Sequence, residues 1–354
     1  MPNSVFDNNR IFTNSDPNNS QIRWRLLKEK LAELGYDLVT ADDRDLHDCA
    51  GIIFHDSVSL KDFPNKNFNL RQFLKGILGW GKKNTEGVRD LYKEGVAGGL
   101  KEKMLLLLWE GPAVYPLNFS EKVWERFSYI LTWADDFLQD QRVRHYVMPM
   151  EMNGLIKTPV PFNEKKLLLN ISIHKHSSYS TELYSAREKS VAFFDKHYPT
   201  LFDLYGTRWN TPVTRLQRFF PFLVKKYNTY RGRTENKLET LSRYKFNLCY
   251  ENNSNVNGYI SEKIFTAIQA RTVPIYLGAP NIQDYVDPDT FIDRRNFKTE
   301  KELADFLISM TEYEYQKYLD AGHRYSHSEK YIKFLPSSFC DTIIDILKKS
   351  SIID

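Results

Sequence analysis

One stretch of the chain combines side chains that could bind an anion with the elements that would position them. Residues 244–278 read YKFNLCYENNSNVNGYISEKIFTAIQARTVPIYLG. An apolar run typical of a buried strand leads into an asparagine-rich loop, and Ser261 then begins a predicted helix that continues with Glu262 and Lys263. A helix N-terminus beyond the carboxyl end of a strand offers unpaired N–H groups to an anion.

The position of Lys263 predicts a negatively charged ligand. The helix dipole disfavours a cation in the first turn, so a lysine there calls for a compensating anion. A nucleotide diphosphate would supply one. The alternative is that Glu262 and Lys263 are ordinary solvated residues of the first turn, but the strand, the asparagine loop and the adjacent Tyr259 argue against it.

A second candidate side chain lies in the N-terminal half of the chain. The run KMLLLLWEGP predicts a buried strand that ends at Glu110, and the Gly-Pro turn fixes the end of that strand. Strand ends of this kind carry active-site groups in α/β proteins, and a carboxylate there can accept a proton as a general base. The alternative is an exposed or capping glutamate.

The motifs YKFNLCYEN, GYISEKI and VPIYLG, followed by FI and DRRNF, resemble the signature of glycosyltransferase family 10, the α1,3/α1,4-fucosyltransferases. The resemblance is strong over about residues 200–320 and weaker over 100–200. It implies an α/β protein of GT-B fold, with two Rossmann-like domains facing a central cleft. It also implies inverting transfer of L-fucose from GDP-β-L-fucose to a hydroxyl group of an oligosaccharide or glycolipid acceptor, with O3 of N-acetylglucosamine or glucose as the expected position.

The resemblance also assigns site residues. Inversion needs one base, and Glu110 matches the family's glutamate before a proline-containing turn. Arg187 in SAREKS and Arg208 in LYGTRW resemble basic positions that would contact phosphate or neutralise the leaving diphosphate; the alternative for each is a surface arginine. The positions that match the family's donor contacts are Asn252, Tyr259, Glu262 and Lys263.

The sequence around three other polar residues indicates which roles they could have. His174, in ISIHKHS, is expected in a loop that approaches the donor. Asp135 and Asp136 resemble an acidic metal motif, but Lys263 and the arginines would already neutralise the diphosphate. We therefore expect no metal site and no cofactor besides the donor substrate GDP-fucose. Two alternatives stay open: the same fold acting on another GDP-deoxysugar, and a non-catalytic nucleotide- or glycan-binding protein.

The pattern of apolar runs predicts two α/β domains in the 354 residues. We expect an N-terminal acceptor-binding domain over 1–160, a C-terminal domain that binds GDP-fucose over 161–330, and a closing helix over 331–354. Predicted strands in the first domain include YDLVTA and CAGIIFHD, and the glycine-rich segment 76–99 is expected to be a surface insertion or a lid over a ligand.

Charge and cysteine usage exclude several classes of protein. Lys and Arg exceed Asp and Glu by 49 − 45 = 4, too small an excess to indicate a nucleic-acid partner. Three well-separated cysteines predict neither a disulfide framework nor a zinc site. This cysteine usage indicates a reducing compartment, and the polar N-terminal residues lack the pattern of a secretory signal, so we expect a cytoplasmic protein. No apolar run reaches the length of a membrane span. The closing helix would pack on the domains or touch the inner surface of the membrane.

Overall fold

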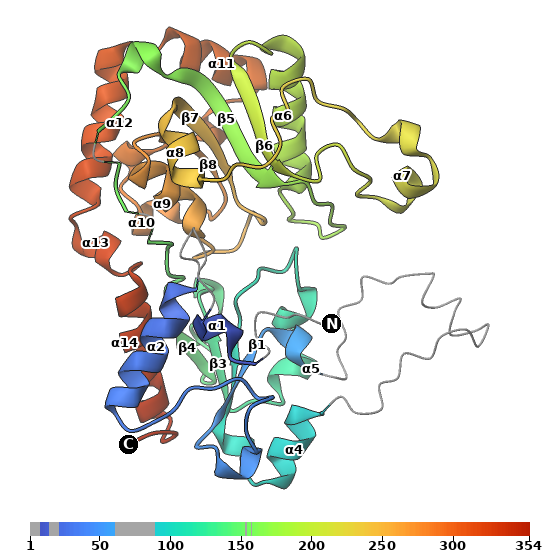
Figure 1. Ribbon diagram of the computed structural model, residues 1–354, viewed down its shortest axis with the longest axis vertical. Helices are drawn as coiled ribbons and strands as arrows, with labels where there is room; N and C mark the ends of the chain where they lie inside the picture. The colour runs from blue at the N-terminus through green and yellow to red at the C-terminus, as the bar shows by residue number, and fades with distance from the viewer. Residues whose placement is uncertain (1–7, 14–20, 61–88, 153, 157) are drawn as a thin grey trace.

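Two parallel sheets, one above the other, form the framework of the protein (Figure 1). The computed structural model describes residues 8–13, 21–60, 89–152, 154–156 and 158–354. In these residues a four-stranded sheet has the order β1-β2-β3-β4 and a five-stranded sheet the order β6-β5-β7-β8-β9. All strand pairs within both sheets are parallel. This confirms the expected α/β class with two Rossmann-like domains, the arrangement called GT-B.

The N-terminal sheet is covered by helices on both faces. Its strands are β1 (Ile52–His55), β2 (Met104–Leu107), β3 (Tyr129–Thr132) and β4 (Val143–His145). Leu105 and Leu107 pack in the cluster that contains α2 (Ile22–Glu33) and α14 (Pro336–Lys349). Met104 and Leu106 point to the other face, toward α4 (Leu91–Ala97) and α5 (Glu121–Trp124). Burial on both faces explains why β2 is a continuous apolar run.

The C-terminal sheet has the same layered construction. Its strands are β5 (Lys166–Ile173), β6 (Phe202–Thr207), β7 (Tyr244–Tyr250), β8 (Val273–Leu277) and β9 (Ile292–Asp293). Helices α6 (Tyr184–His197) and α11 (Glu300–Ser309) share one apolar cluster with the sheet. Apolar clusters that include residues of α8 (Lys237–Ser242) and α9 (Glu262–Gln269) also pack against it, and α12 (Glu312–Tyr325) lies beside α9. The remaining short α-helices are α1 (Arg10–Thr13), α7 (Arg215–Phe219), α10 (Ile282–Tyr285) and α13 (Glu329–Ile332).

The closing helix α14 returns to the N-terminal domain and lies beside α2 (Figure 1). Its apolar residues Phe339, Ile343, Ile346 and Leu347 are all buried in the cluster they share with α2. Of the two alternatives for this helix, the structure shows packing on a domain, and these apolar side chains are not available to a membrane surface. None of the described helices is long and apolar enough to cross a bilayer.

The predicted strand YDLVTA is not a strand. Over residues 36–40 the chain pairs with no strand among the residues that the structure describes, and the backbone N–H of Thr40 donates to Asn9 Oδ1 at 2.8 Å. The segment has the apolar pattern of a strand, but the backbone N–H of Thr40 bonds to the side chain of Asn9 instead of to a neighbouring strand. In the glycine-rich segment 76–99, residues 76–88 lie outside the described part of the chain, and most of the rest forms α4.

Candidate functional site

The carboxyl ends of the two sheets meet at the junction of the domains. The ring of Trp133, just after β3, lies 4.6 Å from the ring of Tyr259, just before α9. The backbone N–H of Ala113, after β2, donates to Asn253 Oδ1 at 3.1 Å. This is the edge at which parallel α/β sheets bind ligands, and the segments that carry Glu110 and Tyr259 both lie there.

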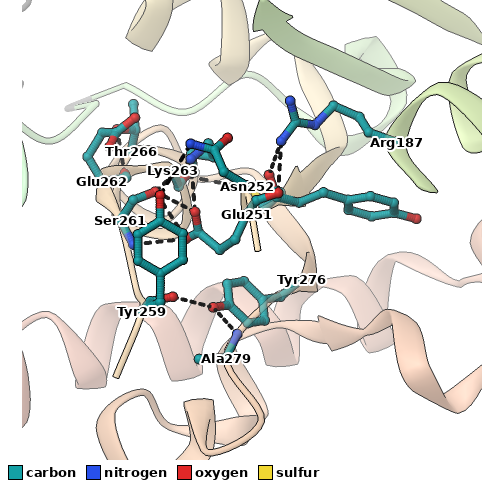
Figure 2. Close-up of polar contacts among 12 residues, drawn as sticks. Arg187, Glu251, Asn252, Tyr259, Ser261, Glu262, Lys263, Thr266, Tyr276 and Ala279 are labelled. Carbon is teal, nitrogen blue, oxygen red and sulfur yellow. Dashed lines mark hydrogen bonds and ion pairs between the residues drawn. The ribbon is translucent and has the colours of Figure 1, made fainter. Parts of the chain in front are cut away.

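A buried carboxylate organises the start of α9 (Figure 2). Glu251 is fully buried and follows β7 directly. Its carboxylate accepts hydrogen bonds from the backbone N–H of Ser261 at 2.8 Å and from the Ser261 hydroxyl at 2.7 and 3.0 Å. Ser261 is the N-cap residue of the helix, but its side chain binds Glu251 instead of capping the helix. The loop and the helix start are therefore fixed to the end of β7.

Lys263 completes this network. Its Nζ lies 2.9 Å from Glu251 Oε2 and donates to Ser261 Oγ at 2.8 Å. Burial alone would lower the pKa of Lys263, but the Glu251 and Glu262 carboxylates outweigh it, so the pKa is raised and the ammonium stays charged. The sequence predicted an anion beside Lys263. In the structure the Glu251 carboxylate is such an anion.

Glu262 occupies the first position of α9, where the helix dipole favours a carboxylate. Burial would raise its pKa, but the ammonium groups of Lys263 and Lys237 outweigh burial and hold the pKa well below its usual value. Lys237 Nζ lies 3.7 Å from Glu262 Oε1. Glu262 therefore stays ionised beside two cations.

Tyr259 and Asn252 stand on the side of the network that faces the N-terminal domain. The Asn252 side-chain amide donates to the Tyr259 hydroxyl at 3.2 Å, and the Tyr259 ring is buried against Trp133. Gly258 makes this approach feasible, because a Cβ atom there would lie 2.2 Å from the carbonyl oxygen of Trp133. Its φ of +79° also favours glycine.

Arg187 is not a surface arginine, which was the alternative to a phosphate contact. It is buried in α6, and one of its guanidinium nitrogens donates to the carbonyl oxygens of Tyr250 at 2.6 Å and Glu251 at 3.0 Å (Figure 2). Burial lowers its pKa from the ordinary arginine value. Arg187 thus holds the carboxyl end of β7 directly behind the Glu251 network.

Arg208 and His174 do not join this network. Arg208 is exposed just after β6, with a φ of +68°. His174 is buried just after β5, where its ring stacks on Trp209 at 4.5 Å and its Nε2 lies 3.4 Å from Glu188. The donor contacts expected for these two residues stay predictions.

Glu110 follows β2 in the opposite domain, and the charges of Lys263 and Glu262 act on its carboxyl group. Burial raises the pKa of Glu110, the charges of Lys175 and Lys263 oppose that shift, and the charge of Asp56 adds to it. The net result is a carboxyl group whose pKa lies above its ordinary value. A base of raised pKa is better matched to proton transfer near neutral pH.

Sequence reasoning missed the residues that hold Glu110. Asp56, buried directly after β1, accepts the backbone N–H groups of Trp109 at 2.7 Å and Glu110 at 3.1 Å through Oδ1. The Asn118 side-chain amide donates to the same oxygen at 2.6 Å and to the Glu110 carbonyl at 2.9 Å. The available signal was the position of Asp56 at the carboxyl end of a predicted strand.

Tyr184, the first residue of α6, was also missed. Its hydroxyl is buried and, within the described residues, has no hydrogen-bond partner. Burial, with Glu110 as the next cause, raises its pKa to about 12, and the charges of Arg187 and Lys263 act on it in the opposite direction. An unsatisfied buried hydroxyl among these charged groups is an available contact for a ligand.

Asp135 and Asp136 join the two domains. The Asp135 carboxylate accepts hydrogen bonds from the Tyr285 hydroxyl at 2.7 Å and from the Asn281 amide at 2.8 Å. Asp136 accepts the backbone N–H of Asn257 at 3.0 Å. In the described part of the chain, no group of three His, Cys, Asp or Glu residues is arranged to hold a metal ion.

Several curated proteins resemble parts of the chain. An α-(1,3)-fucosyltransferase of Helicobacter pylori is 41% identical over 80 residues, which are 23% of this chain and 16% of that protein. An α-(1,4)-fucosyltransferase of Arabidopsis thaliana is 30% identical over 145 residues, or 39% of this chain and 36% of that protein. The matched segment thus spans well under half the length of either relative.

A solved α1,3-fucosyltransferase with GDP superimposes over 70% of this chain and 74% of its own, with a TM-score of 0.42 and 17% identity. The model of glycosyltransferase family 10 (fucosyltransferase), C-terminal part, matches residues 176–352. That range is half of the chain, and it contains the strand β7, the Glu251 network and the start of α9. The chain therefore belongs to glycosyltransferase family 10 (fucosyltransferase).

Proposed function

We propose that the protein is an inverting fucosyltransferase that transfers L-fucose from GDP-β-L-fucose to a hydroxyl group of an oligosaccharide or glycolipid. The observation that supports this most directly is that the segments carrying Glu110 and the Glu251–Lys263 network touch at the domain junction, where Ala113 N–H donates to Asn253 Oδ1, and that the charge of Lys263 acts on the Glu110 carboxyl group. One side offers a carboxylate base, and the other offers the Lys263 ammonium, held in place by Glu251, beside the N-terminus of α9. Direct displacement at a sugar carbon needs both.

The donor would lie on the C-terminal side of the junction. Lys263, at the N-terminus of α9, would attract the diphosphate, because the ammonium and the helix N–H groups both favour an anion. The pairing with Glu251 holds Lys263 in one orientation before the donor arrives. Asn252, Tyr259 and Glu262 lie around that position and are the proposed further donor contacts.

Glu110 would accept the proton of the acceptor hydroxyl. As that oxygen bonds to C1 of fucose, the bond from C1 to the diphosphate oxygen breaks and GDP leaves. The proton passes to the Glu110 carboxylate, and the anomeric configuration inverts from β to α. Glu251 is a poor alternative base because Ser261 and Lys263 already occupy its carboxylate.

We propose that the reaction needs no metal ion or other cofactor. Lys263 and the α9 N-terminus supply positive charge where the leaving diphosphate would develop negative charge. The proposed setting is a reducing compartment such as the cytoplasm, and the proposed acceptor hydroxyl is O3 of N-acetylglucosamine or glucose. The three cysteines are free thiols, which supports the compartment.

Incubation of the protein with GDP-fucose and a panel of glycan acceptors, followed by linkage analysis, tests the proposal. We expect an α-linked fucosyl product that still forms in EDTA. Turnover with another GDP-deoxysugar but not with GDP-fucose would favour the same fold with a different donor. GDP binding without any turnover would favour a non-catalytic binding protein. Loss of activity in EDTA with rescue by manganese would contradict the metal-independent mechanism.

A further inference from the structure

A short segment between β6 and α8 exposes an unusual number of apolar side chains. It consists of α7 and the 3₁₀ turn Pro221–Leu223, and we call residues 214–224 the aromatic loop. Phe219 and Phe222 are 80% and 81% exposed, more than any other large apolar side chain in the described residues. The other exposed apolar residues of the loop are Leu216, Phe220 and Leu223.

The aromatic loop is held away from the body of the C-terminal domain (Figure 1). Within the described residues, none of its apolar side chains belongs to a hydrophobic cluster of the protein. Thr214 and Gln217 form a capping box, so the helical turn has a defined local structure. An exposed apolar patch of this kind in a folded protein marks an interaction surface.

The charge around the loop identifies the kind of surface. No acidic residue lies between Asp203 and Glu235, whereas seven Lys and Arg residues do. Arg218, Lys225 and Lys226 are exposed beside the phenylalanines. Apolar side chains that enter the acyl boundary, flanked by cations that meet lipid phosphates, are the features of an interfacial anchor.

The chain reaches the loop from the carboxyl end of β6, through residues 208–213, and that end lies at the same edge of the sheet at which β7 leads into the Glu251 network. We propose that the aromatic loop docks the protein on an anionic phospholipid bilayer. Docking by this edge would bring the domain junction close to glycans carried at the bilayer surface. The surface is distinct from α14, whose apolar residues are buried against α2.

A second copy of the chain is a less favourable occupant of this surface. In a symmetric contact, each aromatic loop would meet the same loop of the other copy, and the exposed cations Arg218, Lys225 and Lys226 of the two loops would repel. An anionic bilayer has the opposite charge and accepts the exposed rings without a shaped pocket. The charge pattern therefore favours lipid over self-association.

Sedimentation of the full chain with vesicles tests the proposal. Vesicles of phosphatidylcholine with about one quarter phosphatidylglycerol should bind the protein, and phosphatidylcholine alone should bind it much more weakly. Phe219→Ser/Phe222→Ser should weaken binding about tenfold or more, because the anchoring rings are lost. Arg218→Gln/Lys225→Gln/Lys226→Gln should weaken it about fivefold per charge at low salt and less at high salt.

Matched variants elsewhere on the surface serve as controls. Tyr313→Ser/Ile308→Ser removes two other apolar side chains, 72% and 47% exposed, and should leave vesicle binding unchanged. Lys298→Gln/Lys317→Gln/Lys348→Gln removes three exposed charges far from the loop in sequence and should have little effect. A difference between the loop variants and these controls shows that the site is local.

Two results would overturn the proposal. One is equal vesicle binding by the wild type and Phe219→Ser/Phe222→Ser. The other is a light-scattering result in which the wild type is a dimer and this double variant is a monomer. That result would mean that the loop binds a second copy of the chain. Transfer to a free oligosaccharide acceptor should be unchanged in the loop variants. If neither the wild type nor any variant transfers fucose to the free acceptor, the result would instead count against the proposed function.

Discussion

Asp56 Oδ1 accepts the backbone N–H of Glu110 at 3.1 Å, so a buried carboxylate fixes the residue that we propose as the base. Asp56 has a φ of +59°, a backbone conformation that side-chain-bearing residues rarely adopt. The strained residue lies at the end of β1, and its contacts reach the end of β2. Two neighbouring strands thus position Glu110 together.

Replacing Glu110 with glutamine should separate activity from stability. The amide cannot accept the acceptor's proton, so turnover should fall by roughly 10² to 10⁴. The free energy of unfolding at neutral pH should stay equal or rise, because a carboxylate with a raised pKa is costly to keep ionised in the folded state. Turnover and urea unfolding on one preparation check this, and a variant with normal turnover removes Glu110 from the mechanism.

The pH profile should report the environment of Glu110. A base must be deprotonated, so kcat/KM should rise with pH through the folded-state pKa of Glu110, and that acid limb should lie above the ordinary glutamate value of 4.5. Asp56→Asn removes a like charge and should move the limb to lower pH. Asp136→Asn, at the exposed contact with Asn257, serves as the control. An acid limb that Asp56→Asn leaves in place would contradict the assignment.

Replacing Glu251 should restore the stability that is lost when Lys263 is replaced, but it should not restore GDP binding. Lys263→Met leaves the buried Glu251 carboxylate without its cation and should cost up to about 3 kcal/mol of unfolding free energy. Adding Glu251→Gln should recover much of that loss. Neither variant should regain GDP affinity, since the ammonium that would contact the diphosphate is absent. Calorimetric titration with GDP that shows normal affinity in the stable double variant would exclude Lys263 as the diphosphate contact.

Tyr184→Phe should weaken donor binding without destabilising the free protein. The buried hydroxyl has no partner within the described residues, so its removal loses no hydrogen bond there and relieves the desolvation cost. A donor that satisfies this hydroxyl should bind several-fold more weakly to the variant. Tyr227→Phe is the control, because its hydroxyl donates to Glu188 at 3.3 Å and its loss should lower stability but not GDP-fucose affinity. Equal donor affinity in Tyr184→Phe and the wild type would make the hydroxyl irrelevant to binding.

Gly258→Ala should test the contact between the domains. The added Cβ would lie 2.2 Å from the Trp133 carbonyl oxygen, so the loop before α9 or the end of β3 must move. Gly232→Ala is a matched control, because its φ of +85° is similar but a Cβ there meets nothing within 4 Å. Thermal unfolding should show a clearly larger loss for Gly258→Ala. Equal losses would mean that only the backbone strain matters.

The sequence by itself determined the elements and the motif residues. Short apolar runs separated by helical segments predicted parallel sheets, and Ser261 marked the start of α9 because the strand, loop and helix of this motif are contiguous. The same contiguity placed Asn252, Tyr259, Glu262 and Lys263 near one another. Such predictions rest on local sequence patterns, which a chain carries without its tertiary contacts.

Tertiary structure alone decided the partners of these residues. Nothing local shows that Glu251 neutralises Lys263, that Asp56 holds Glu110 across 54 positions, or that the apolar face of α14 covers α2. Residues 36–40 have a strand-like pattern but no strand partner in the described part of the chain, because pairing depends on which segments the fold brings alongside. Burial and charge pairing arise only when distant segments meet, so the protonation and orientation of the site follow from the fold.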